Sequence, residues 1–313
     1  MPSVFIDGQA GTTGLQITER LQARGDIDLL SLDDTQRKAP AARREALFQA
    51  DIAILCLPDD AAREAVALAD GRTRIIDAST AHRVHADWVY GLPELTAGQR
   101  ERVAGAHLVS NPGCYPQGFM LLVRPLIDAG LLSPDTPLRC NAVSGYSGGG
   151  RKMIEAHQAF DAADAEQLNS QLYGLTLAHK HVPEMQAYSL CRQTPLFTPM
   201  VAHYYNGMLV QVPLFTAELG GATPDTVQAA LAAAYADEPF INVLDPSSGD
   251  EFLNPTACNG SNRMDLMVYG HARQVLLVAR YDNLGKGAAG AAVQNLNLML
   301  GLDEQLGLQA AAG

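Results

Sequence analysis

The first 80 residues alternate between short apolar runs and amphipathic segments, and this alternation constrains the fold more than any other feature. Residues 4–6 are apolar, and Leu15, Ile17 and Leu21 then recur at helical spacing as far as Gly25. Further apolar runs lie at residues 29–32, 51–57 and 73–77, with helical patterns at 41–48 and 61–68 between them. Such alternation predicts a Rossmann-like, doubly wound α/β domain, with a parallel sheet that binds its ligand at the carboxyl ends of the strands.

A glycine-rich loop joins the first predicted strand to the first predicted helix. Its spacing is GxxGxxG, which differs from the GxGxxG of the commonest dinucleotide fingerprint. Bare backbone at a helix N-terminus can nevertheless approach a pyrophosphate. A glycine turn without a ligand explains the same pattern, so both interpretations stay open. The candidate coenzyme-binding residues are Gly8, Gly11, Thr12, Thr13 and Gly14, with Leu57, Pro58 and Ser79 at the ends of later strands.

The second predicted strand leaves the choice of coenzyme open. Asp33 lies about 20 residues beyond the glycines, where a carboxylate can hold the ribose 2′-hydroxyl of NAD. Ser31, Arg37 and Lys38 lie close by and can hold the 2′-phosphate of NADP instead. The two cations also fit an ordinary solvated surface, so local chemistry does not decide between the coenzymes.

Cys114 is the candidate nucleophile. An apolar segment at residues 107–109 and an Asn-Pro-Gly turn precede it, and apolar residues then recur at helical spacing until Gly130. Pro116 falls where the first helical turn tolerates proline. A thiol at a helix N-terminus can have its pKa lowered from about 8.5 to roughly 3.5–7.5, which produces the reactive thiolate. The alternative is a small buried core residue, which is the commoner role of cysteine.

A second glycine-rich loop follows a predicted strand at residues 138–144. The loop presents many backbone N–H groups, and two cations stand at its end, before a predicted helix at 153–160. This combination suits an anionic, phosphate-like group, although a flexible surface loop is the alternative. The candidate substrate-binding residues in this segment are Ser144, Gly145, Ser147, Arg151 and Lys152.

His179, Lys180 and His181 form a third group, directly before a proline and a glutamate that open a helix. A histidine here can act as a general acid and base at neutral pH, and Lys180 can balance substrate charge. If the segment is extended, the two histidines share one face and Lys180 takes the other. The alternative is that both histidines have no catalytic role and only form hydrogen bonds at the polar start of the helix.

The remainder of the chain predicts an α+β domain with a mostly antiparallel sheet, because strands follow one another with few helices between them. These strands lie at residues 208–213, 240–244, 264–269 and 274–281, with a helix from Thr223-Pro224 to about 237. The open face of such a sheet is a natural dimer surface. An apolar helix at 288–300 is expected to return to the first domain, which brings Asn283 to the coenzyme unless it only caps the helix.

The predicted boundaries are therefore residues 1–113 plus about 283–313 for the coenzyme domain, and 114–282 for the catalytic and dimerisation domain. With 47% apolar residues the chain of 313 residues can bury a large core. Its net charge of −12 argues against a nucleic-acid partner and requires a local cationic pocket for an anionic substrate. Five widely spaced cysteines without metal-binding spacing indicate reduced thiols in a cytoplasmic protein and no metal site. No apolar run approaches the length of a membrane span, and no signal peptide is expected.

Three segments carry a resemblance to a known family. They are Tyr-Gly-Leu-Pro-Glu-Leu at 90–95, Ser-Asn-Pro-Gly-Cys-Tyr-Pro at 110–116 and His-Lys-His-Val-Pro-Glu at 179–184. With the two glycine loops and residues 283–295, they make nearly the whole chain resemble N-acetyl-gamma-glutamyl-phosphate reductase in its shorter form. The first glycine loop alone is shared with aspartate-semialdehyde dehydrogenases.

The resemblance implies NADPH-dependent reduction of an acyl phosphate to N-acetylglutamate semialdehyde, in arginine biosynthesis. A homodimer or homotetramer is also expected. Cys114 would form a thioester, and His181, or less readily His179, would act as acid and base. Arg151, Lys152 and Lys180 would neutralise the substrate. The NADP(H) coenzyme of the family favours Ser31, Arg37 and Lys38 over Asp33. A reductase of aspartyl phosphate and a non-catalytic nucleotide-binding homologue are the alternatives.

Overall fold

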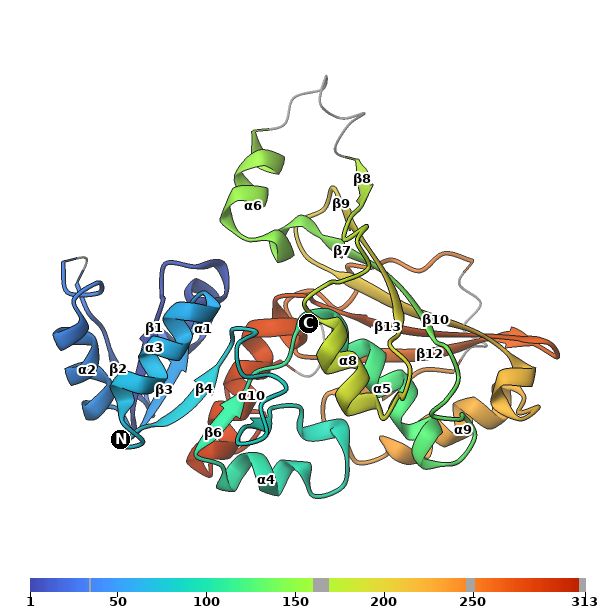
Figure 1. The fold of residues 1–313 in the computed structure, drawn as a ribbon, viewed down its shortest axis with the longest axis horizontal. Coiled ribbons are helices and arrows are strands. Elements are labelled where there is room, and N and C mark those ends of the chain that lie inside the picture. The colour runs from blue at the N-terminus through green and yellow to red at the C-terminus, as the bar shows by residue number, and fades with distance from the viewer. Residues whose placement is uncertain (34, 160–168, 246–250, 310–313) are drawn as a thin grey trace. The chain divides into compact units, whose positions relative to one another are not determined.

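The computed structural model describes residues 1–33, 35–159, 169–245 and 251–309. The chain forms two compact units (Figure 1). The first unit contains Met1–Gly113 and Ala288–Leu308, and the second contains Cys114–Gly287 and Gln309. The chain therefore returns to the first unit at Ala288, and Asn283 belongs to the second unit. The predicted C-terminal end at residues 310–313 and the predicted helix end at residue 160 lie outside the described residues.

The described strands of the first unit form a six-stranded parallel sheet in the order β2-β1-β3-β4-β6-β5. The strands are β1 (Ser3–Asp7), β2 (Asp28–Leu30), β3 (Ile52–Leu55), β4 (Arg74–Asp77), β5 (Val89–Tyr90) and β6 (Leu108–Ser110). The helices are α1 (Thr12–Gln22), α2 (Pro40–Gln49), α3 (Asp59–Ala69), α4 (Gln99–Gly105) and α10 (Gly290–Leu300). The predicted doubly wound fold is confirmed, with β5 and α4 as additions.

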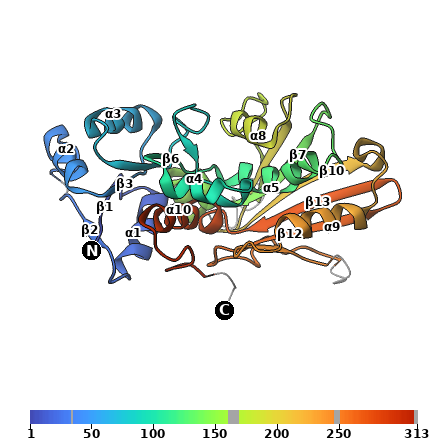
Figure 2. The ribbon, with the colours of Figure 1, turned by 90° about the horizontal axis from the view of Figure 1, so that it is seen from below.

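Helices cover both faces of this sheet because alternate side chains of its strands point in opposite directions. Val4 and Ile6 of β1 pack in one cluster with Ile17 of α1 and Val293 of α10. Phe5 of the same strand joins the cluster that α2 and α3 cover. Figure 2 shows α2 and α3 above the sheet and α1 and α10 below it. The final helix thus covers the first sheet, as its apolar composition predicts.

The described strands of the second unit form a seven-stranded mixed sheet in the order β11-β12-β13-β10-β7-β9-β8. They are β7 (Arg139–Gly145), β8 (Ser170–Leu172), β9 (Leu196–Ala202), β10 (Met208–Phe215), β11 (Ile241–Val243), β12 (Met264–His271) and β13 (Gln274–Tyr281). Most neighbours are antiparallel, as predicted, but β7 and β9 pair in parallel, and so do β11 and β12. The sequence analysis did not predict β8 or β9. Pro199 within β9 removes a strand donor and hides the strand signal.

Helices of the second unit are α5 (Cys114–Asp128), α6 (Arg151–Gln158), α8 (Val182–Ser189) and α9 (Pro224–Ala234). Helix α5 begins at Cys114, as predicted, and Gly130 has the left-handed φ of 70° that ends it. A π-helix, Gly285–Ala289, precedes α10, so helical structure begins before residue 288, where the helix was predicted to start. No helix in the described ranges is long and apolar enough to cross a membrane.

Candidate active site

Cys114 is the first residue of α5, where backbone N–H groups lack partners within the helix. The residue is half-buried, so its sulfur is not sealed in the core. Gly287 leaves room beside it, because a Cβ on that glycine would lie 3.1 Å from Cβ of Cys114. A thiolate here lies at the positive end of the helix dipole, with donors ready for a developing oxyanion.

Two tyrosines that were not among the predicted site residues lie close enough to Cys114 for its charge to affect their pKa. The hydroxyl of Tyr173 donates to the hydroxyl of Tyr115 over 3.0 Å. Burial, the largest cause, raises the pKa of Tyr173 to about 12 and that of Tyr115 well above its usual range, and negative charge on Cys114 contributes to both. Both phenols therefore stay neutral hydrogen-bond donors near the nucleophile. Tyr115 stands within the cysteine motif, but nothing in the sequence links it to Tyr173.

The two candidate histidines come together beside Tyr115. Their ring centroids are 4.7 Å apart, and that of Tyr115 is 5.9 Å from His181 and 6.2 Å from His179. The condition of an extended backbone is not met, because His181 has φ −86° and ψ −14° in a turn before α8. The rings still lie together, and Lys180 is exposed. The N–H of His181 donates to Nδ1 of His179 over 3.2 Å, so that nitrogen acts as an acceptor.

The second glycine loop lies between β7 and α6 in the same unit. Gly145 tolerates no side chain there, because a Cβ would lie 2.3 Å from the carbonyl oxygen of Tyr205. Ser144 and Ser147 are buried, whereas Arg151 and Lys152 are exposed in the first turn of α6. The loop thus presents its two cations outward and its serines inward.

The side chain of Asn283 is engaged within the second unit. Its amide nitrogen donates to the hydroxyl of Ser147 over 2.9 Å, and its carbonyl oxygen accepts the N–H of Gly207 over 2.8 Å. These two bonds fasten the glycine loop to the turn before β10. The coenzyme contact predicted for Asn283 stays a prediction.

The first glycine loop forms a cradle at the N-terminus of α1. Gly8 has φ 93°, and a Cβ there would lie 2.3 Å from the carbonyl oxygen of Cys56. A Cβ on Gly14 would lie 2.4 Å from the carbonyl oxygen of Gly8. Gly11 precedes α1 and is exposed, with nothing closer than 3.6 Å to a Cβ there, and Thr12 and Thr13 open the helix. These residues fit a pyrophosphate group.

The carboxylate of Asp33 already has partners within its own turn. One of its oxygens accepts the N–H of Thr35 over 2.8 Å, the N–H of Gln36 over 2.8 Å and the hydroxyl of Thr35 over 2.6 Å. These bonds, that of the Thr35 hydroxyl first, hold the pKa of Asp33 below its usual value. Ser31, Arg37 and Lys38 are exposed around the same turn. The turn therefore exposes two cations, whereas its carboxylate accepts hydrogen bonds from the turn itself.

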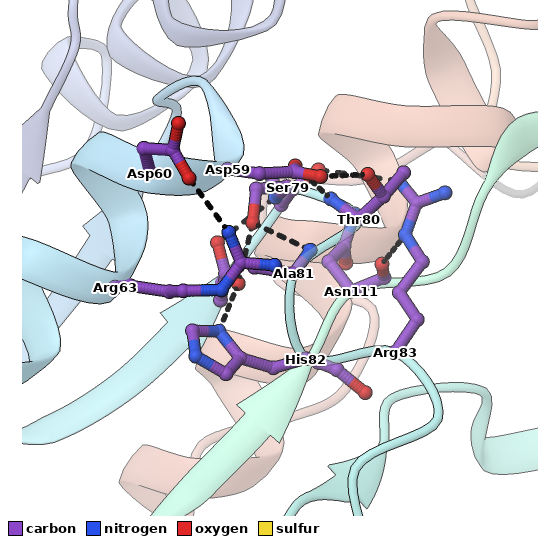
Figure 3. Close-up of polar contacts among 12 residues, drawn as sticks. Asp59, Asp60, Arg63, Ser79, Thr80, Ala81, His82, Arg83 and Asn111 are labelled. Carbon is purple, nitrogen blue, oxygen red and sulfur yellow. Dashed lines mark hydrogen bonds and ion pairs between the residues drawn. The ribbon is translucent and has the colours of Figure 1, made fainter. Parts of the chain in front are cut away.

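A polar cluster at the end of β4 fixes the loop that carries Ser79 (Figure 3). The buried carboxylate of Asp77 accepts the N–H and the hydroxyl of Ser79 over 2.9 and 2.7 Å, and Nδ1 of His82 lies 2.6 Å from it. The ring of His82 stacks on Trp88 at 4.2 Å. The sequence analysis selected Ser79 and missed the partners that hold it.

The same loop is tied to the neighbouring strand ends of the first unit. The carboxylate of Asp59, in the first turn of α3, accepts the N–H and the hydroxyl of Thr80 over 2.9 and 2.6 Å. The guanidinium of Arg83 donates to the carbonyl oxygens of Asn111 and Ala78, both over 3.2 Å. Leu57 and Pro58 lie between β3 and α3 beside this cluster. Three strand ends of the first unit thus meet at one polar edge, as in other doubly wound sheets.

Comparison with known proteins first defines the class. A family model described as semialdehyde dehydrogenase, NAD binding domain, matches residues 14–104, and one described as semialdehyde dehydrogenase, dimerisation domain, matches residues 114–283. The crystal structure of aspartate semialdehyde dehydrogenase II from Vibrio cholerae matches with TM-score 0.70 and 16% identity, covering 96% of this chain and 98% of that chain. The enzyme from Francisella tularensis matches with TM-score 0.73 and 15% identity over 96% and 100%. The chain has the fold and the two domains of this class.

Closer relatives define the family. The N-acetyl-gamma-glutamyl-phosphate reductase of Brucella suis is 52% identical over 308 residues, which cover 96% of this chain and 99% of that protein. N-acetyl-gamma-glutamyl-phosphate reductase 2 of Nostoc sp. is 50% identical, with 98% and 99% covered. The chain belongs to the N-acetyl-gamma-glutamyl-phosphate reductase family, and the resemblance drawn from the sequence motifs is confirmed.

Proposed function

We propose that this chain is an NADPH-dependent reductase of N-acetyl-gamma-glutamyl phosphate in the cytoplasm. Its products are N-acetylglutamate 5-semialdehyde and phosphate, and the step belongs to arginine biosynthesis. The observation that carries the proposal is Cys114 at the first residue of α5, beside neutral tyrosines and His181. The names of relatives about 50% identical over nearly the whole chain support the substrate.

The first chemical step forms a thioester. The Cys114 thiolate attacks the carbonyl carbon of the acyl phosphate, and the bond from that carbon to the phosphate oxygen breaks. Backbone N–H groups at the start of α5 stabilise the oxyanion that develops. Arg151, Lys152 and Lys180 stand exposed in the same unit and offset the negative charge of the substrate.

The second step releases the aldehyde. The glycine cradle of the first unit would hold NADPH, which would supply the hydride for reduction of the thioester on Cys114 to a thiohemiacetal. His181 gives a proton to the oxygen that gains negative charge, and takes it back as the carbon–sulfur bond breaks. The sulfur leaves as thiolate, ready for the next cycle. His181 suits this role better than His179, whose Nδ1 accepts a backbone N–H.

The choice of NADPH over NADH rests on the turn after β2. Asp33 directs one oxygen to three donors of its own turn, which weakens its suitability as a partner of a ribose 2′-hydroxyl. Ser31, Arg37 and Lys38 are exposed there and offer one hydroxyl and two cations to a 2′-phosphate. The resulting site is selective for the phosphorylated coenzyme.

Replacing the nucleophile tests the covalent step. Cys114→Ser is expected to reduce turnover to background while NADPH binds as before, because a serine hydroxyl at this position is a far weaker nucleophile. Phosphate-dependent NADP reduction with N-acetylglutamate semialdehyde measures turnover, and NADPH fluorescence titration measures binding. Turnover near that of the unaltered protein would remove the thioester mechanism. A preference for the four-carbon aspartate aldehyde would replace the proposed substrate.

The two histidines give a matched pair of variants. His181→Asn is expected to lower kcat by about 10²–10⁴, the usual contribution of general acid–base catalysis. His179→Asn is expected to cost less, since asparagine also offers an oxygen to the N–H of His181. The measurement is kcat in the same assay, with coenzyme binding as the check on folding. A larger loss in His179→Asn would assign the proton transfer to that residue.

Coenzyme selectivity is tested by removing both cations of the turn. Arg37→Ala combined with Lys38→Ala is expected to raise KM for NADPH about tenfold or more, the loss of roughly one charge-assisted hydrogen bond, and to leave KM for NADH nearly unchanged. Asp33→Asn serves as the comparison. It is expected to change KM for NADPH and KM for NADH by much less than tenfold. Equal effects of the double variant on the two coenzymes would return Asp33 to the role of ribose partner.

We also infer a homodimer or homotetramer in which a second copy covers the open face of the seven-stranded sheet. This face contains a hollow of about 480 Å³. Phe215 lines it and leaves 54% of its surface exposed. A family model described as a dimerisation domain matches this unit, which supports the assignment. Other residues around the hollow include Arg139, Pro213, Tyr269, His271, Gln274 and Leu276.

A charge placed on this face tests the assembly. Phe215→Asp is expected to shift the protein toward the monomer in sedimentation velocity, because it removes an apolar ring from the interface and would bury a charge there. Leu306→Asp is the control, since Leu306 is exposed in the first unit. If both variants sediment as the same oligomer as the unaltered protein, the interface lies elsewhere.

A further inference from the structure

Tyr281 bridges the first turn of the helix that carries the nucleophile. In an α-helix the carbonyl of residue i pairs with the N–H of residue i+4, which here are Cys114 and Gly118. The hydroxyl of Tyr281 donates to the carbonyl oxygen of Cys114 over 2.6 Å, and the N–H of Gly118 donates to that hydroxyl over 3.2 Å. A side chain from β13 thus contacts both members of the first helical pair.

The sequence makes room for this ring. A Cβ on Gly118 would lie 2.8 Å from the hydroxyl oxygen of Tyr281 and 3.1 Å from Cβ of Val210. Tyr281 is fully buried and pairs with Met208 of β10 in the sheet register. The hydroxyl is therefore held by a rigid sheet, and glycine at position 118 lets the helix approach it.

The hydroxyl can act only as a neutral group at this place. Burial, the largest cause, raises the pKa of Tyr281 well above its usual range, and negative charge on Cys114 raises it further. A neutral phenol has one proton to donate, and the short contact directs that proton to the Cys114 carbonyl. The backbone of the nucleophilic residue is consequently anchored from a different element of the unit.

We propose that Tyr281 is a positioning residue for the nucleophile, whose hydroxyl fixes the first turn of α5 and thereby the direction and reactivity of the Cys114 thiol. A side chain inserted beside a helical pair changes the local geometry of that turn. Small displacements of a reacting group can cost about 10² in rate. The catalytic consequence rests on the proposed reductase function, whereas the effect on the thiol does not.

The variant Tyr281→Phe isolates the hydroxyl. Phenylalanine keeps the packing of the ring but lacks the hydroxyl. The Cys114 carbonyl and the Gly118 N–H can then form a hydrogen bond directly. The rate of alkylation of Cys114 by iodoacetamide is measured against pH, with peptide mass mapping to identify the alkylated cysteine. For Tyr281→Phe we expect about tenfold slower alkylation of Cys114 at pH 7 and a rate profile moved to higher pH. In the reductase assay we expect about tenfold lower kcat and little change in KM for the acyl phosphate.

Tyr235→Phe is the matched control. Its hydroxyl donates to the carbonyl oxygen of Leu121 in the same helix over 2.7 Å, and Tyr235 is also buried. This variant loses a similar bond on α5 farther from Cys114, so it is expected to keep the alkylation profile of the unaltered protein. Cys56 adds no background, because burial, then Asp77 and Asp7, raises the pKa of its thiol to about 12.

Two results would overturn the proposal. One is an alkylation profile of Tyr281→Phe equal to those of Tyr235→Phe and the unaltered protein. The other, decisive if Tyr281→Phe does not fold, is an unaltered profile in Gly118→Ala, whose methyl group would displace the Tyr281 ring. Alkylation requires no substrate, so the test keeps its meaning if the unaltered protein shows no reductase turnover.

Discussion

The beginning of α5 at Cys114 is the constraint on which the rest of the second unit depends. A helix that begins at Cys114 has its first N–H groups, which lack partners within the helix, and the positive end of its dipole beside this residue. The sheet contributes Tyr281 beneath the first turn, and Gly287 leaves room beside the sulfur. These contacts all lie at the N-terminal end of α5, so the packing of the neighbouring elements depends on where Cys114 begins the helix.

The groups around the sulfur differ in charge from those at the edge of the site. Tyr115 and Tyr281 are buried and Tyr173 is half-buried. Loss of solvation raises the pKa of each phenol, so all three remain neutral donors. Arg151 and Lys152, by contrast, are exposed on α6. This arrangement avoids the cost of burying several charges and leaves the two cations in contact with solvent. A chain with a net charge of −12 can thus still carry positive charge locally.

The sequence predicts the features that depend on neighbouring residues, such as the positions of helices. The Pro-Gly turn before Cys114, the helical spacing after it and Gly130 beyond were sufficient to place α5, and the apolar run after residue 288 placed α10. Long-range contacts were not predictable: Tyr173 meets Tyr115 across 58 residues of sequence. Pro199 concealed β9. The sequence did not decide whether residues 179–181 are extended; His181 lies in a turn, and the two histidines meet. Periodicity predicts elements, whereas partners depend on tertiary packing.

The central claim, a thioester on Cys114, is tested most directly by mass spectrometry. The protein is mixed with N-acetyl-gamma-glutamyl phosphate without coenzyme, quenched in acid and digested. The account predicts an added N-acetylglutamyl group on the peptide containing Cys114, removed by hydroxylamine. An unmodified Cys114 peptide, from a preparation that turns over when NADPH is added, would contradict it.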